Sequence, residues 1–480
     1  MNSSKPLKHA LAASLAAFSL VAAGQAMAAA TIIINNINAP GVGFNDPTPA
    51  TPIGGNTGTT VGEQRLIAFT YAANIWGARL TSSVPIIINA QFTALSCTAT
   101  SGVLGSAGAT SIFRDFAGAT RTGTWFSYAL ANKLSGSYLG TLNAPQINSN
   151  FNANLGQPGC LAGPGWYYGL DGNEPTGGID FVAVLMHEMA HGLGFQTFTS
   201  GSTGAFNGGF PSIWDHFLFD AVNGVSWAQA TEAQRQASAI SIDRLVWTGS
   251  NVQAAVPLVL RQGLPGVGIS GPAAGALAGT QLLAGEASFG ATLTGGGLSG
   301  EVMPVVTPTG GGSACGPLTA SDARAVSGKI ALVDRGVCGF TVKVKNAQNA
   351  GAIGVLIADN VAGSPPPGLG GADPTVTIPA VRITQADGNA LKTQLQRRSR
   401  TSSGVFARIG LFGTQIAGAD ALGRMLMFAP NPFQGGSSVS HFDTTASRNQ
   451  LMEPSINSDL TQSVSPPIDL TFPLFQDIGW

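Results

Sequence analysis

Residues 187–191 read His-Glu-Met-Ala-His, an H-E-x-x-H pattern that follows the apolar run Phe181–Met186. On a helix, side chains four residues apart lie on one face, so His187 and His191 can direct ring nitrogens at one metal ion. Glu188 lies next to His187 in the sequence and can take a proton from a water bound to that metal. Zinc lowers the pKa of its bound water to about 7, and the resulting hydroxide can attack a peptide carbonyl. The pattern therefore predicts a hydrolytic zinc site.

The helix alone gives such a site too few ligands. A catalytic zinc usually takes three protein ligands and leaves a position for water. One common pattern adds a third histidine shortly after Gly194, at the position that Thr197 occupies here. Two other histidines, His216 and His441, are candidates for the third ligand. The carboxylate alternatives, in the manner of thermolysin-type zinc proteases, are Asp215, Asp220 and Glu232.

Three further segments extend the pattern. His441 lies in "SSVSHFD", Met452 lies in "NQLMEPSI", and the sequence closes with "LFQDIGW". Together with "HEMAHGLGF", these segments resemble the metzincin zinc proteases, and among them the leishmanolysin-like branch. In that branch a long insertion displaces the third histidine from the helix, and a methionine turn lies beneath the zinc. The resemblance implies the ligands His187, His191 and His441, the base Glu188, a helix-ending turn at Gly194, and Met452 below the metal.

Several elements must hold these residues in place. Asp180 precedes the apolar run and can cap its helix, which Gly192 and Gly194 can end. Apolar residues recur at helical spacing within residues 66–76, and "VPIIINAQF" is rich in β-branched residues, as in a strand. A second helix is expected within residues 123–136, "GTWFSYALANKLSG".

The middle of the chain has a different character. The segment "GKIALVDRGVCGFTVKVKNAQNAGAIGVLIADN" predicts a strand, a cysteine turn, a helix over Thr341–Ala350 and a second strand. Its "RG-C-F" turn and "NA…AGA" helix resemble the protease-associated (PA) domain, over roughly residues 255–415. The resemblance implies a small β-rich domain with flanking helices and no catalytic residues, which governs substrate access or protein contacts. A structural spacer is the alternative.

These segments divide the chain into four parts with an α+β fold. A basic start, an apolar run and the small-residue site "AMA" predict a signal peptide over residues 1–28. A metzincin-like catalytic domain, with a mixed sheet and the active-site helix, is expected over residues 29–252 and 416–480. The β-rich PA domain, residues 253–415, would interrupt it and account for the 441 − 191 = 250 residues between the second and third histidines.

The four cysteines indicate disulfides rather than a metal site. An even number in an exported chain predicts two bridges, and the chain has no C-x-x-C spacing. Three pairings are open. The simplest joins Cys97 to Cys160 and Cys315 to Cys338, because each bridge then closes within one domain. Under the PA resemblance, the second bridge would clamp the entry loop of that domain.

Composition limits the partners. Charged residues make up 10% of the chain and the formal net charge is −1, whereas nucleic acids and anionic membranes select concentrated basic surfaces. Beyond the signal peptide, no apolar run is long enough to span a membrane. The expected location is therefore extracellular, with the periplasm as the alternative. The expected cofactor is one zinc ion and the expected substrates are proteins or peptides, while the sequence decides neither calcium binding nor oligomeric state.

Two functions from different classes fit these features. The first is an exported zinc endopeptidase in which Glu188 activates the water. The second is a binding or adhesion protein on a decayed protease scaffold, which is suggested by Thr197 at the position where the short zinc pattern has a histidine. The intact Glu188 and the complete alternative ligand set favour the first.

Overall fold

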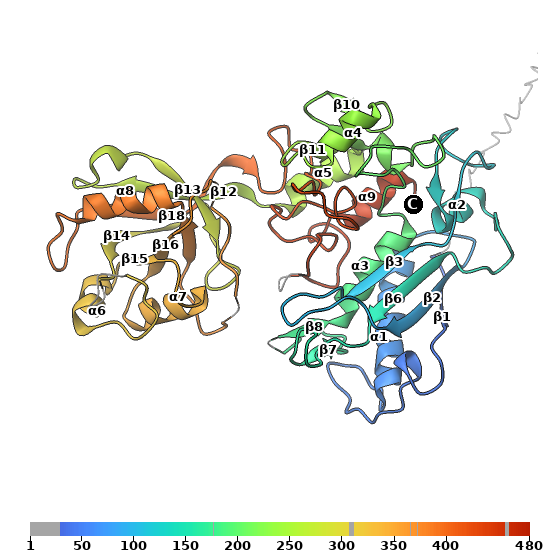
Figure 1. Cartoon of the computed structure of the whole chain (residues 1–480), viewed down its shortest axis with the longest axis horizontal. Helices are drawn as coiled ribbons and strands as arrows, with labels where there is room; N and C mark the ends of the chain where they lie inside the picture. Colours follow the sequence, from blue (N-terminus) through green and yellow to red (C-terminus); the bar gives the residue numbers. More distant parts are fainter. Residues whose placement is uncertain (1–28, 176, 307–311, 365, 372, 457–459) are drawn as a thin grey trace, which may run out of the picture.

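A computed structural model describes residues 29–175, 177–306, 312–364, 366–371, 373–456 and 460–480, so the predicted signal peptide lies outside the described residues. Figure 1 shows the chain as two bodies that lie side by side. The first body, coloured blue to green and red, contains both ends of the described chain. The second body, coloured yellow to orange, is formed by the residues between them.

A four-stranded mixed sheet supports the first body. Its strand order is β1-β2-β6-β3, with β1, β2 and β6 parallel and β3 antiparallel to β6 at the edge. Along β2, Ile88, Ala90 and Phe92 are buried while Asn89 and Gln91 between them are half-buried, as expected for a strand with one covered face. The bounds are β1 Ile32–Asn36, β2 Ile86–Thr93, β3 Gly105–Ala109 and β6 Ile147–Asn152.

Two helices pack against this sheet and against each other. Helix α1, Val61–Arg79, begins with a capping box in which Thr60 and Glu63 each accept the other's backbone N–H. Helix α3, Phe181–Leu193, contacts β3, β6 and α1, and every residue of α3 except His191 is buried. Because α3 is buried on all sides, its sequence is apolar on all sides as well. No helix in the described part of the chain is long and apolar enough to cross a membrane.

The last helix, α9 (Thr471–Ile478), is bonded to an element of the first body that lies far from it in the sequence. Its Asp477 accepts the backbone N–H groups of Asn251 and Val252 and so caps α5, Ser250–Val259. This contact gives the terminal "FQDIGW" segment a structural role. The shorter elements of the body are η1 Gly43–Asn45, β4 Ile112–Phe113, β5 Phe126–Ser127, α2 Tyr128–Ser135, β7 Gly165–Tyr167, β8 Gly178–Asp180, η2 Trp214–His216, β9 Leu218–Asp220, β10 Val225–Ser226, α4 Glu232–Ser238 and β11 Leu245–Trp247.

The second body is a closed barrel with the strand order β12-β13-β17-β16-β15-β14-β18. Strands β14, β15, β16 and β17 run parallel to one another, and the strands that flank them, β18 and β13, are antiparallel to β14 and β17. The predicted strand–turn–helix–strand segment forms β15, α7 and β16. The bounds are β12 Gln262–Ser270, η3 Gly275–Leu277, β13 Gln281–Glu286, β14 Leu298–Pro304, α6 Ala320–Val326, β15 Ile330–Asp334, α7 Phe340–Asn349, β16 Gly354–Ala358, β17 Ala380–Ile383, α8 Gln385–Leu395 and β18 Phe406–Ile416.

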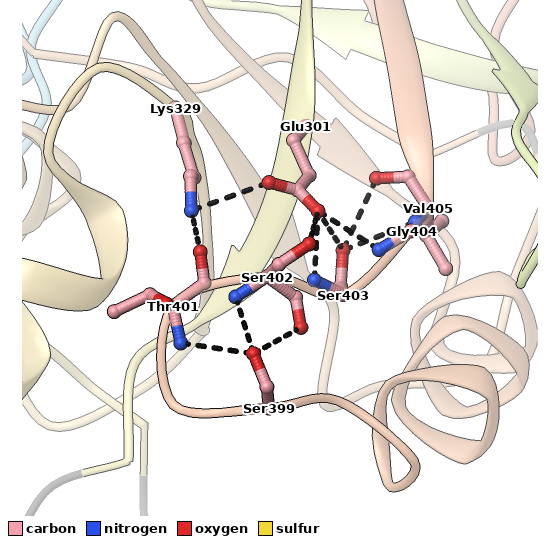
Figure 2. Close-up of polar contacts among 8 residues, drawn as sticks. All are labelled: Glu301, Lys329, Ser399, Thr401, Ser402, Ser403, Gly404 and Val405. Carbon is pink, nitrogen blue, oxygen red and sulfur yellow. Dashed lines mark hydrogen bonds and ion pairs between the residues drawn. The ribbon is translucent and has the colours of Figure 1, made fainter.

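Glu301 in β14 holds the loop that leads into β18 (Figure 2). One carboxylate oxygen accepts the Ser402 hydroxyl at 2.7 Å and the backbone N–H groups of Ser403 and Gly404 at 2.7 and 2.8 Å. Lys329 lies 3.2 Å from the other oxygen. Because a single carboxylate receives donors from three consecutive residues, it fixes this loop to the barrel wall.

The first body extends through α5, past residue 252, where the composition of the chain changes. Val252, Val256 and Val259 of α5 are buried in the same core as α9, and β12 begins only at Gln262. The chain leaves the barrel when β18 ends at Ile416. A change in composition shows where glycine and valine become frequent, but it does not show in which hydrophobic core a helix packs.

Both disulfides form in the simplest of the three possible pairings. Cys97 is bonded to Cys160 in the first body, and Cys315 is bonded to Cys338 in the barrel. The expectation that each bridge closes within one domain is therefore confirmed. A bridge of this kind typically stabilises a fold by about 2–4 kcal/mol, because it restricts the unfolded chain.

Candidate metal centre

Local chemistry fixes both ends of the helix that carries His187 and His191. At the start, the Asp180 carboxylate accepts the backbone N–H of Val182 at 2.8 Å, as predicted. At the end, Gly194 adopts φ +125°, a conformation that favours glycine. Gly192 differs from the prediction, because it lies inside α3 and does not end it. A Cβ at Gly192 would lie 2.3 Å from Cγ2 of Ile147, so this glycine is required for close packing of α3 on β6.

The Nε2 atoms of His187, His191 and His441 converge on one point. Nε2 of His191 lies 3.2 Å from that of His187 and 3.2 Å from that of His441, and the third separation is 3.3 Å. A tetrahedral zinc ion about 2.0–2.1 Å from each nitrogen requires separations of about 3.3–3.4 Å. The three rings therefore have the spacing of three ligands around one ion.

The opposite ring nitrogens settle the tautomers of the three histidines. Each Nδ1 lies 2.8 Å from a backbone carbonyl oxygen, which can only accept, so each Nδ1 carries the proton and donates it. A neutral ring with a protonated Nδ1 has a bare lone pair at Nε2. The Nε2 contacts are therefore not hydrogen bonds, and three lone pairs face one another. The donor–acceptor pairs are His187 with Leu451, His191 with Phe195 and His441 with Ser437.

The surroundings keep these rings neutral. Burial lowers the pKa of His187 to about 4 and, with the neighbouring His187, that of His191 to about 3. Burial and the other two rings also lower the pKa of His441 well below its usual value. His187 and His441 are buried, whereas His191 is partly exposed. Neutral, convergent and partly accessible donors suit a bound metal ion.

Glu188 lies buried between α3 and the edge strand β3. Burial raises its pKa to about 8, against a hydrogen bond from the backbone N–H of Ala107 that lowers it. A Cβ at Gly105 would lie 2.8 Å from Cγ of Glu188, so β3 can approach the carboxylate only because Gly105 has no side chain. Gly105 and Ala107 could not be identified from the sequence, since a run of small residues gives no signal of what it packs against.

The segment around Met452 contacts the histidines through its backbone. Leu451 supplies the carbonyl that accepts the Nδ1 proton of His187. The N–H of Phe442, next to His441, donates to the carbonyl of Met452 at 2.8 Å. Met452 itself is fully buried. These two bonds join the segment predicted to form the methionine turn to both the helix and the third histidine.

His216 lies outside the histidine cluster. It belongs to the short helix η2, and its Nε2 is 3.1 Å from the hydroxyl oxygen of Thr124. Burial lowers its pKa to about 4, with a contribution from Arg121. Of the two histidines that the sequence left open, His441 is the one that the fold brings to His187 and His191.

The carboxylates that were alternative ligands are engaged elsewhere. Asp215 is fully buried and accepts the hydroxyls of Thr197 and Thr199 at 2.7 and 2.5 Å. Asp220 accepts backbone N–H groups within its own turn, and Glu232 begins the exposed first turn of α4. Thr197, which stands where the short zinc pattern has a histidine, therefore serves as a donor to Asp215.

Comparison with protein families identifies one part of the chain. Residues 299–391 match the PA domain family, which confirms the resemblance that the sequence predicted for the middle of the chain. The match begins in β14 and ends in α8, within the barrel. None of the three clustered histidines lies inside it.

The curated relatives share a short stretch with this chain. A probable lipoprotein aminopeptidase of Mycobacterium tuberculosis is 39% identical over 90 residues, 19% of this chain and 18% of that protein. A receptor homology region, transmembrane domain- and RING domain-containing protein of Oryza sativa subsp. japonica is 36% identical over 107 residues, 22% of this chain and 19% of that protein. The chain spans about a fifth of the length of these relatives. Because proteins with such different names share the stretch, it assigns no catalytic activity to this chain.

Among solved structures, a zinc aminopeptidase from Bacillus subtilis is similar over 34% of this chain and 37% of that chain, at 24% identity and a TM-score of 0.22. At that TM-score the similarity assigns neither a fold nor an activity. The strands, the helices and the family match together establish the coarser class. The chain is a mixed α+β protein that carries a PA domain.

Proposed function

We propose that this protein is an exported zinc endopeptidase in which His187, His191 and His441 hold one zinc ion. The observation that carries the proposal is that the Nε2 lone pairs of these three histidines converge on one point. Helix α3, which bears two of the histidines, also bears the buried carboxylate of Glu188. Neutral imidazole nitrogens are preferred zinc ligands, and three lone pairs at this spacing are favourable only around a cation.

Glu188 would move the protons of the reaction. Zinc bound to the three histidines would polarise the peptide carbonyl and lower the pKa of a bound water toward about 7. The Glu188 carboxylate would accept the proton of that water and deliver it to the amine that leaves when the peptide bond breaks. Because Glu188 is buried, its carboxyl group can hold the proton between these two transfers away from bulk water.

The edge strand β3 favours an endopeptidase over an aminopeptidase. β3 pairs with β6 on one side, and no described strand pairs with its other side. Through Ala107, it presents a backbone N–H to Glu188. An extended peptide can add to such an edge by main-chain hydrogen bonds, with residues on both sides of the bond to be cut. An aminopeptidase instead binds the free amino terminus of its substrate, next to the bond that it cuts.

The metzincin type, and within it the leishmanolysin-like branch, is proposed from the origin of the ligands. Two come from one helix, the third follows an inserted PA domain, and the backbone at Met452 is bonded to the neighbour of His441. The complete donor set argues against a decayed binding protein. Two disulfides fit an oxidising compartment and support export, with proteins or peptides as substrates.

The test compares Glu188→Gln with the wild type, using zinc analysis and an internally quenched peptide blocked at both ends. We expect the variant to keep one zinc per chain and to lose about 10²–10⁴-fold in kcat, the usual contribution of a general base. Glu232→Gln, on the exposed start of α4, is the matched control and should keep both. A wild type without zinc, or one that cleaves only peptides with a free amino terminus, would contradict the proposal.

A further inference from the structure

A buried carboxylate, Asp469, is connected to His187 through a single residue. Oδ2 of Asp469 accepts the backbone N–H of Leu451 at 2.7 Å. The carbonyl of Leu451 accepts the Nδ1 proton of His187 at 2.8 Å. Both bonds are buried, so Leu451 is held at its N–H by Asp469 while its carbonyl holds the imidazole.

Asp469 is a buried carboxyl group with no cationic partner among the described residues. It is 2% exposed, and the groups that act on it are backbone and hydroxyl donors, with no lysine, arginine or histidine of the described residues among them. Its other oxygen accepts the N–H of Thr471 at the start of α9, at 2.8 Å. Burying an unpaired carboxylate costs several kcal/mol. Burial raises the pKa of Asp469, against the hydrogen bonds from Leu451 and Thr471, which lower it.

The neighbouring contacts keep Leu451 in place on both sides. The side-chain oxygen of Gln450 accepts the N–H of Leu470 at 2.9 Å, so two consecutive residues are bonded to the segment before α9. On the other side, the carbonyl of Met452 accepts the N–H of Phe442. A shift of Leu451 would therefore disturb both the partner of His187 and the segment that carries His441.

We propose that Asp469 is a positioning residue of the metal centre, which fixes Leu451 so that its carbonyl aims the His187 ring. The inference rests on the proposed zinc site. Groups that orient a ligand from behind typically contribute about 10–100-fold in metal affinity. Here the orienting carboxylate acts through a backbone carbonyl, and it lies in the last segment of the chain rather than beside the histidine pattern.

Helix α9, which begins two residues after Asp469, offers a matched control. Asp477 is also a carboxylate that accepts backbone N–H groups, those of Asn251 and Val252, together with the indole N–H of Trp247. Its partners lie at the start of α5, and none of its hydrogen bonds leads to a zinc ligand. Asp469→Asn and Asp477→Asn therefore make the same chemical change on two carboxyl groups that both accept backbone N–H groups.

The test measures zinc affinity by competition with a chromophoric chelator, and the visible spectrum of the cobalt-substituted protein. We expect Asp469→Asn to lower zinc affinity about 10–100-fold and to shift the cobalt bands, whereas Asp477→Asn leaves both as in the wild type. Thermal unfolding of the metal-free proteins separates a general loss of stability from the effect on the site. Asp469→Ser, a second uncharged variant, should show the same loss of affinity as Asp469→Asn.

The outcomes distinguish this inference from the function on which it rests. If the wild type binds zinc and the Asn variants at positions 469 and 477 have equal affinities and cobalt spectra, the positioning role of Asp469 is wrong while the zinc site stands. If the wild type binds no zinc, both the proposed function and this inference are wrong. Peptide cleavage is not needed for either decision.

Discussion

The Nε2 atoms of His191 and His441 lie 3.2 Å apart, although the entire PA body separates the two residues in the sequence. The two facts are compatible because of the way the chain crosses between the two bodies. The N–H of Ala417 donates to the carbonyl of Arg261 at 2.9 Å, so the insertion leaves and returns at the same place. An inserted domain that folds with its ends together spares the host most of the entropy of closing a long loop. The third ligand can therefore follow the insertion without loss of geometry.

Of two histidine variants, one should weaken metal binding and the other should leave it unchanged. His441→Ala removes one of three converging donors, and we expect it to lower zinc affinity by more than the about 10–100-fold typical of residues that only orient a ligand. His216→Ala removes a contact with Thr124 and should leave zinc affinity unchanged. The measurement is zinc content after dialysis, with affinity from chelator competition. Loss of zinc from the His216 variant alone would show that the third ligand is misassigned.

Two glycines of β3 provide a matched pair for testing how Glu188 is placed. A Cβ at Gly105 would lie 2.8 Å from Cγ of Glu188, whereas a Cβ at Gly108 would meet nothing closer than 4.0 Å. We expect Gly105→Ala to reduce kcat by about 10–100-fold with zinc still bound, since a misplacement of about 1 Å can cost 10²-fold. Gly108→Ala should keep wild-type kcat. Equal activities in the two variants would mean that β3 does not position the carboxylate.

The parts of the site that the sequence predicted are those within a few residues of one another. The spacing of His187 and His191, the Asp180 cap and the Gly194 turn all depend on one helix, whose geometry is known from its pattern alone. His441 could be chosen over His216 only through a family resemblance, because no local rule relates residues on either side of an inserted domain.

The contacts that the sequence could not predict are made between elements. Gly105 and Asp469 carry no local pattern, and their importance arises from what the fold places next to them. Gly192 was expected to end a helix because glycine often does so, but its close approach to Ile147 decides its role. The boundary expected after residue 252 falls inside α5, because composition does not reveal that the apolar face of this helix packs with α9.

Thr197 should matter for stability and not for the metal. Its hydroxyl donates to the buried Asp215 carboxylate at 2.7 Å. Thr197→Val keeps the shape of the side chain but leaves that acceptor short of a donor, which should lower the free energy of unfolding by about 1–3 kcal/mol. Thr197→Ser keeps the hydroxyl and should lose much less, and both variants should retain full zinc content. Equal losses in the two variants would assign the effect to the methyl group instead.

Because of Glu301, we predict that acid destabilises the barrel of the second body. Burial alone would raise the pKa of Glu301, but hydrogen bonds from Ser402, Gly404 and Ser403 and the proximity of Lys329 lower it to about 2 from its ordinary value of 4.5. A carboxyl group whose pKa is lowered by folding contributes its full stabilisation above pH 4.5, and the contribution disappears as the pH falls toward 2. We expect the barrel of the wild type to lose stability across that window.

Replacing Glu301 by Gln should remove this pH dependence while lowering the stability of the barrel at pH 7 by about 1–3 kcal/mol. All 7 tryptophans lie in the first body, so their fluorescence follows the unfolding of that body. Amide hydrogen exchange in β14 and β18, corrected for the intrinsic rate at each pH, follows the barrel. The variant should exchange faster than the wild type at pH 7 and approach it near pH 2, with Glu232→Gln matching the wild type throughout. Parallel pH profiles for the wild type and the Glu301 variant would contradict the prediction.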